Sequence, residues 1–162
     1  MKHNNMKRIP LTQGKVALVD DDFYEYLNQF KWCVKKNRDT FYAIRHVMKK
    51  GNTKRIWMHR EILNSPEGML TDHRDGDGLN NQRSNLRVCS HVQNNRNRRM
   101  RLDNSSGYKG VQWRKDREKW RAIIKVGQKL KHIGNFTSKI EAAKAYDKAA
   151  KKYFGKFAKL NF

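Results

Sequence analysis

The chain has 162 residues, enough for one ordinary domain or two small ones. It holds 37 Lys and Arg against 15 Asp and Glu, so its formal net charge is +22 and nucleic acid is the expected partner. There is no long apolar run and no basic amphipathic helix with a bulky apolar face, which argues against a membrane protein.

The first residues, MKHNNMKRIP, lack the apolar segment of a signal peptide. The two cysteines, Cys33 and Cys89, form no CxxC pair. We therefore expect a cytoplasmic protein with neither a cysteine zinc site nor a disulfide-linked partner.

Residues 8–60 alternate between strand and helix signals. Residues 8–14 predict a short strand that ends in a turn, and residues 15–20 predict a second strand. Residues 20–30 predict a helix with Asp20 or Asp21 as N-cap and with one apolar face formed by Phe23, Tyr26, Leu27 and Phe30. Residues 31–36 and 41–50 predict the two strands of a hairpin. Residues 55–63 predict a segment that runs into a short helix.

The next stretch is rich in turn residues and contains two short strand signals, at residues 69–73 and 85–90. A helix capped by Ser90 is expected over residues 90–102. The polar break DNSSG at residues 103–107 predicts a linker between two domains, residues 1–102 and residues 108–162.

The C-terminal segment predicts three consecutive antiparallel strands and one helix. The strands are expected at residues 108–114, 119–126 and 129–136. The helix starts at a capping box, Ser138-x-x-Glu141, and stops at Gly155. Its buried stripe is expected to contain Ile140, Ala143, Tyr146, Ala150 and Phe154.

The pair Asp72-His73 stands out because a carboxylate has no use in a purely DNA-binding surface. If the strands at 69–73 and 85–90 pair, the following helix can bring Asn94 to Asp72. A carboxylate and an amide oxygen are hard ligands that suit one Mg²⁺ or Mn²⁺ ion. A nearby His can take a proton from water, so these parts suffice for metal-assisted hydrolysis of a phosphodiester.

The string DHRDGDGLNN…SNLRVCS…QNNRNR resembles the HNH (ββα-metal) nucleases, especially the homing endonucleases of phage introns. The resemblance implies that His73 is the general base, that Asp72 and Asn94 bind the metal, and that Asn85 braces the loop and orients His73. Arg98 shares the face of Asn94 and is expected either to contact the scissile phosphate or to be a solvated or backbone-binding arginine. Arg96 and Arg99 are candidate DNA contacts. His59 lies in an MHR segment common in relatives, and we expect it to pack.

Residues 105–162 resemble the Apetala-two / ethylene-response-factor DNA-binding domain, through SGYKGV, KW.A.I, IGNF, EAAKAYDKAA and KLNF. That family reads DNA from its three strands. The implied DNA-binding residues are Lys109, Gln112, Trp113, Arg114, Lys119, Arg121 and Lys125. For the lysines, nonspecific phosphate binding is the alternative to base readout. Gln112 and His132 stand where the family has Arg and Trp, so its target sequence is not carried over.

Together these features predict an α+β protein, with a ββα-metal HNH module followed by a three-stranded antiparallel sheet plus one helix. The predicted function is a metal-dependent homing endonuclease that nicks one strand of double-stranded DNA, as a monomer or weak dimer, in a bacterial or phage-infected cell. One alternative is a DNA-binding regulator with a degenerate nuclease fold, against which the intact Asp72, His73, Asn85 and Asn94 argue. Another is a basic packaging protein, against which the two motif-bearing domains argue.

Overall fold

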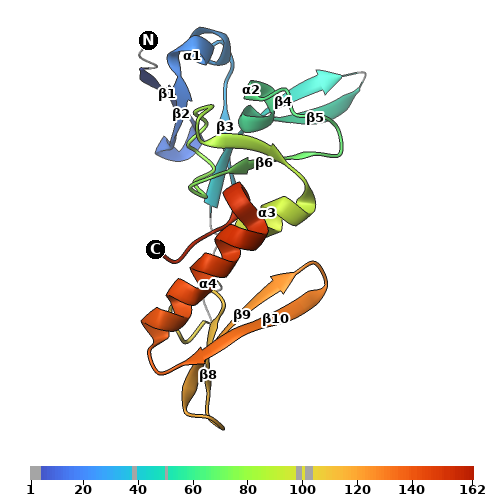
Figure 1. Cartoon of the computed structure of the whole chain (residues 1–162). Helices are drawn as coiled ribbons and strands as arrows, with labels where there is room; N and C mark the ends of the chain where they lie inside the picture. Colours follow the sequence, from blue (N-terminus) through green and yellow to red (C-terminus); the bar gives the residue numbers. More distant parts are fainter. Residues whose placement is uncertain (1–4, 38–39, 50, 98–99, 101–103) are drawn as a thin grey trace. The chain divides into compact units, whose positions relative to one another are not determined.

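The computed structural model describes residues 5–37, 40–49, 51–97, 100 and 104–162 (Figure 1). The chain divides into two compact units, residues 1–94 and residues 95–162. The described residues form four small antiparallel sheets together with short helices and one long helix, which confirms the mixed α+β class. None of the helices in this part of the chain is both long and apolar enough to span a membrane. The predicted linker at residues 103–107 stays a prediction.

The N-terminal unit begins with a hairpin and a short helix. Strand β1 (Met6–Pro10) pairs with β2 (Val16–Asp20) across the 3-10 turn η1 (Thr12–Gly14), and α1 (Asp21–Leu27) follows directly. Asp20 is the N-cap residue as predicted, but its side chain makes no capping hydrogen bond. Its Oδ2 instead accepts from the backbone N–H of Arg83, 2.7 Å away, so it holds a distant loop.

A three-stranded sheet follows, with the strands in the order β3-β4-β5. The hairpin of β3 (Cys33–Asn37) and β4 (Thr40–Lys49) was predicted, whereas β5 (Asn52–Trp57) is a third strand that the sequence analysis did not separate from the helix after it. That helix, α2 (Met58–Ile62), begins as soon as β5 ends. The unit closes with β6 (Leu70–His73) and β7 (Leu86–Cys89), and α3 (His91–Asn97) continues from β7 into the next unit.

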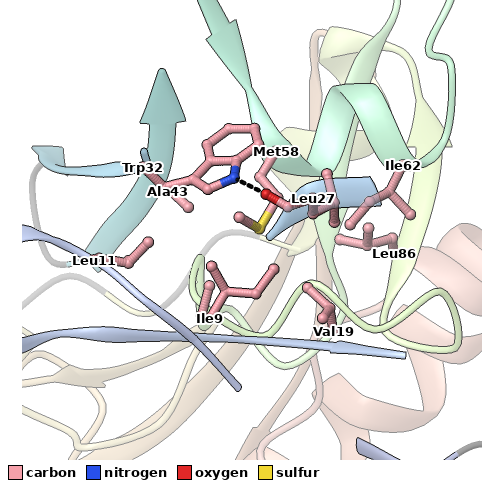
Figure 2. Close-up of a cluster of buried hydrophobic side chains, with 10 residues drawn as sticks. Ile9, Leu11, Val19, Leu27, Trp32, Ala43, Met58, Ile62 and Leu86 are labelled. Carbon is pink, nitrogen blue, oxygen red and sulfur yellow. Dashed lines mark hydrogen bonds between the residues drawn. The ribbon is translucent and has the colours of Figure 1, made fainter. Parts of the chain in front are cut away.

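One buried cluster joins these elements, and Figure 2 shows its side chains. Leu27, Trp32 and Met58 are almost fully buried there, and the indole N–H of Trp32 donates to the carbonyl oxygen of Leu27 at 2.8 Å. The indole thereby satisfies its one donor inside an apolar core. Of the predicted apolar face of α1, only Leu27 is fully buried; Tyr26 is exposed, and its hydroxyl donates to Glu61.

The C-terminal unit is a sheet of strand order β10-β9-β8 with one helix packed against it (Figure 1). Its strands are β8 (Val111–Arg114), β9 (Lys119–Val126) and β10 (Lys129–Phe136). The predicted first strand began three residues too early, because Gly110 has φ +75° and Val111 N–H donates back to Tyr108 O in a turn. Alternation along β9 is as predicted, with Ala122 and Ile124 buried and Lys119 and Lys125 exposed.

Helix α4 (Lys139–Phe154) has the predicted ends. Ser138 Oγ accepts from Ile140 N–H at its start, and Gly155 is its C-cap with φ 52°. The stripe Ala143, Tyr146, Ala150 and Phe154 is buried as predicted, but Ile140 is exposed because it lies in the first turn, beyond the edge of the core. After the short η2 (Gly155–Phe157), the tail is fixed by Asp147, whose carboxylate accepts from the backbone N–H groups of Asn161 and Phe162.

Candidate active site

The hairpin of β6 and β7 brings the Asp-His pair to the centre of the N-terminal unit. The antiparallel register sets Asp72 opposite Arg87 and His73 opposite Leu86. Both Asp72 and His73 are buried, with 7% and 4% of their surface exposed. The predicted strands therefore pair as expected, and residues 74–85 form the loop that returns from one to the other.

Asp72 makes a buried ion pair with Arg87. Nε and Nη2 of the guanidinium lie 2.8 Å and 2.6 Å from the same carboxylate oxygen, Oδ2. Both side chains are almost fully withdrawn from water, so removing one partner would leave the other charge buried and uncompensated, which is costly. Arg87 was not singled out in the sequence, and only its place opposite Asp72 in the strand pairing could have revealed it.

The imidazole of His73 is in contact with other aromatic rings. It packs on Tyr42 and on His59, with ring centroids 5.7 Å and 5.1 Å apart, and His59 also contacts Trp57. Its Nε2 lies 3.4 Å from Oδ1 of Asn81, a fully buried side chain. In the tautomer with the proton on Nε2, that nitrogen donates to the amide oxygen and Nδ1 is the basic nitrogen.

Burial has the same effect on both histidines. It lowers the pKa of His73 below its ordinary value, while the hydrogen bond to Asn81 and the carboxylates of Asp75, Asp72 and Asp77 act in the opposite direction. It lowers the pKa of His59 to about 3, helped by His73 and Arg60. At neutral pH His73 is therefore the unprotonated imidazole that a general base has to be.

Asn85 braces the loop between the two strands. Its Oδ1 accepts from the backbone N–H of Asp75 at 3.1 Å, and its Nδ2 donates to Asp75 Oδ1 and to Asn80 O. The same loop is tied to the rest of the unit by Leu18, which exchanges backbone hydrogen bonds with Leu79 and Asn81. The predicted role of Asn85, to brace the loop and to orient His73, stays a prediction. The bond to His73 comes from Asn81, a second asparagine of the NN pair that the sequence analysis passed over.

Glycine is required where this loop touches the sheet. Gly78 N–H donates to Thr40 Oγ1 at 3.0 Å, and a Cβ at Gly78 would overlap Phe41 O and the Tyr42 ring. The DGDG sequence therefore lays the loop directly against β4, next to the ring that contacts His73.

Asn94 lies half-buried on α3, and its backbone N–H donates to Ser90 O at 2.9 Å. The helix begins with a full capping box, since Ser90 Oγ accepts from Gln93 N–H and Gln93 Oε1 accepts from Ser90 N–H. Among the described residues, no cluster of three or more His, Cys, Asp or Glu side chains could hold a metal by itself. Arg98 and Arg99 lie outside the described residues.

Some candidate DNA-binding residues of the C-terminal unit already make hydrogen bonds within the protein, and others are exposed. Arg114 is held by both carboxylate oxygens of Asp116, and Arg121 donates to Gln112 Oε1 at 2.8 Å. Trp113 is exposed and packs on Trp120, while Lys119 and Lys125 are exposed on the strand. Lys109 is different: its Nζ donates to Arg96 O at 2.8 Å, and burial lowers its pKa to about 8.

Arg96 is half-buried, and its guanidinium lies over the Phe154 ring at 4.9 Å.

The two cysteines, Cys33 and Cys89, are free thiols, and burial raises the pKa of Cys89 to about 11. A thiol with a raised pKa is a poor nucleophile, so Cys89 is suited to packing and not to catalysis.

Comparison with known proteins gives three matches. Residues 64–96 match a protein family described as HNH endonuclease. The chain is 29% identical to a protein named Uncharacterized HNH endonuclease L560, from Acanthamoeba polyphaga mimivirus, over 92% of this chain and 76% of that protein. It is 41% identical to Protein 3.8 of Escherichia phage T7 over 36% of this chain, and spans about half (49%) of that protein's length.

Proposed function

We propose that the chain is a metal-dependent endonuclease that hydrolyses phosphodiester bonds of double-stranded DNA, because residues 64–96 match the HNH endonuclease family. The observation that carries this proposal is the position of His73 inside the matched segment, buried, neutral and oriented by Asn81. A charge of +22 supplies the attraction to a polyanion.

His73 is the general base of the proposed reaction. Nδ1 takes a proton from the attacking water as the oxygen forms its bond to phosphorus, and the bond from phosphorus to the leaving sugar oxygen breaks. The Nε2–H of His73 stays hydrogen-bonded to Asn81 Oδ1 during this step. Tyr42 and His59 fix the plane of the imidazole through their ring contacts. The bonds of Asn85 keep the loop that carries Asn81 in place.

Asp72 and Asn94 are the proposed ligands of one Mg²⁺ or Mn²⁺ ion. Their carboxylate and amide oxygens are hard donors, and phosphate and water would complete the shell, so the donor set fits such an ion chemically. Asp72 comes to it with Oδ2 already bonded twice to Arg87, which fixes the carboxylate's orientation. When bound, the ion supplies Lewis-acid stabilisation of the charge on the phosphate.

The C-terminal unit is the proposed DNA reader. A positive sheet face can enter the major groove, and Lys119, Arg121 and Lys125 share the side of β9 turned away from the buried Ala122 and Ile124. We propose a nick in one strand by one active site per chain, and a homing or phage-borne role by analogy with the resemblance.

A plasmid-nicking assay tests the proposal. Supercoiled DNA is incubated with the chain and Mg²⁺ or Mn²⁺, with EDTA as the metal-free arm. We expect metal-dependent conversion to the open circle, and a loss of about 10²–10⁴ in rate for His73→Ala with binding retained. His46→Ala removes an exposed imidazole on β4 and serves as the matched control. Binding without cleavage across metals and DNA substrates would instead make the chain a DNA-binding regulator.

A further inference from the structure

The C-terminal unit has a groove of about 560 Å³ between α4 and β10. Its floor is apolar and includes Ile124, Ile133, Ala145 and Ala149. Ala145 and Ala149 are four residues apart on α4 and therefore share one face of the helix, and their small side chains leave the space open. A groove of this size can hold a flat ring system of a ligand.

Three lysines surround this floor: Lys131, Lys148 and Lys152. All three are exposed, and none makes an ion pair with any residue in the part of the chain that the structure describes. Of the described Asp and Glu residues, none lines the groove. The carboxylate nearest in sequence, Asp147, is buried and bonded to the C-terminal tail. The groove therefore attracts an anion at its rim and an apolar group at its floor.

An exposed aromatic ring completes the lining. Tyr153 is 38% exposed, and Nζ of Lys131 lies 5.4 Å from its ring centroid, with Nζ of Lys152 at 6.0 Å. These cation–π contacts keep two ammonium groups at the edge of the groove, where the phosphates of a bound strand would meet them.

The groove lies on the side of the sheet opposite to the proposed reader residues. Ile124 and its cross-strand partner Lys131 face α4, whereas Arg121 and Lys125 alternate to the other side of β9. A duplex on the reader face cannot fill this groove, and the bases of a duplex are stacked inside it and cannot reach an apolar floor. Among the forms of DNA, an unpaired nucleotide is the one that offers a free ring together with adjacent phosphates.

We propose that the groove between α4 and β10 is a binding site for single-stranded DNA, with one base over the floor at Ala149 and its neighbouring phosphates at Lys131, Lys148 and Lys152. The inference rests on the proposed function in that DNA is taken as the ligand. It goes further because it gives the chain a second DNA site, one suited to a strand end or to the strand displaced beside a cut.

Binding without cleavage tests this site. The full chain is titrated in EDTA with a fluorescent oligo(dT) single strand and, separately, with a blunt duplex of the same length. Lys152→Glu reverses a groove charge, and Lys151→Glu makes the same change in the same last turn of α4, outside the groove lining. Ala149→Leu fills the floor without any change of charge.

We expect Lys152→Glu and Ala149→Leu each to weaken single-strand binding by about tenfold, the scale of removing one stacked base, with duplex binding near that of Lys151→Glu and wild type. Equal losses for Lys151→Glu and Lys152→Glu would overturn the proposal in favour of general electrostatics. Unchanged binding by Ala149→Leu would overturn base insertion, and displacement of the oligonucleotide by an acidic, leucine-containing peptide at equal charge would assign the groove to a protein partner. Because EDTA stops cleavage, none of these outcomes depends on nuclease activity.

Discussion

At the scale of single residues, the buried pair of Asp72 and Arg87 is the feature with the largest expected energetic consequence. Arg87→Met leaves the Asp72 carboxylate buried without its guanidinium, and we expect the free energy of unfolding to fall by about 3–5 kcal/mol. Replacing both residues, as in Asp72→Leu with Arg87→Met, removes the uncompensated charge, so most of that loss should be recovered. Urea unfolding followed by tryptophan fluorescence measures both values.

Arg114→Met is the control for this experiment, because it breaks an exposed pair with Asp116 instead of a buried one. It should leave the unfolding midpoint close to that of the wild type. A single variant Arg87→Met that is as stable as the double variant would mean that water reaches Asp72, and the pair would then not be the fixed support proposed for the metal ligand.

His59 should make stability depend on pH. Its pKa is about 3 in the folded chain against an ordinary 6.5, so below pH 6.5 the unfolded chain binds a proton that the folded chain does not. The free energy of unfolding is therefore highest above pH 6.5, as far as His59 is concerned. It falls by about 1.4 kcal/mol per pH unit, for one proton, as the pH drops toward 3. His59→Phe keeps a ring beside Tyr42 and His73 and should flatten this slope, whereas His46→Phe, at an exposed position, should not. The measurement is the free energy of unfolding of the wild type and both variants from pH 7 to pH 4. An unchanged slope in His59→Phe would contradict the assignment to His59.

The element scale shows what sequence patterns can and cannot predict. The pairing of residues 69–73 with 85–90 and the ends of α4 were predictable, because Ser90, Ser138 and Gly155 carry local signals for caps and stops. The apolar face of α1 was predicted too broadly, since periodicity cannot tell that Tyr26 points to Glu61 and not into the core. Strand β5 was missed because its exposed Lys and Arg hide the alternation.

The candidate site divides in the same way. His73, Asp72 and Asn85 could be proposed from the sequence because the family spacing lies within one continuous segment. Asn81, Tyr42 and Arg87 could not, because their roles depend on tertiary contacts: a strand register, a loop held by Leu18 and Asp20, and a ring from a distant sheet. Spacing in the sequence thus points to candidate reacting groups, whose roles stay predictions, and it does not point to the residues that contact them.

Two glycines of the C-terminal unit allow a matched test at this scale. Gly107 and Gly110 share φ +75°, so alanine strains the backbone equally at both. The space around the two positions differs. A Cβ at Gly107 meets nothing within 4 Å, whereas a Cβ at Gly110 overlaps the buried Tyr146 ring. We expect Gly110→Ala to destabilise the unit by about 1–3 kcal/mol more than Gly107→Ala, as measured by thermal unfolding. Equal losses would show that Tyr146 can move aside and that the start of β8 is not fixed by this contact.

At the scale of the whole molecule, the positive charge raises the question of whether any part of the surface is specific. A chain of charge +22 binds DNA wherever lysines are exposed, so affinity alone cannot identify a reader. The salt dependence of binding can identify the reader, because its slope reports the number of phosphates that the protein neutralises in the complex. Charges that remain in solvent do not contribute to that slope.

The comparison therefore needs two variants that remove the same charge from different faces of the C-terminal unit. One combines Lys119→Gln, Arg121→Gln and Lys125→Gln on β9, and the other combines Lys139→Gln, Lys144→Gln and Lys151→Gln on the exposed side of α4. If the sheet reads duplex DNA, the β9 variant should lower the log–log salt slope by about 0.9 for each phosphate that it no longer neutralises. The α4 variant should shift affinity slightly and leave the slope unchanged. Duplex binding measured in EDTA across salt concentrations separates the two. Equal slopes for both variants would move recognition away from this sheet, toward α3 or the basic strands β4 and β5 of the N-terminal unit.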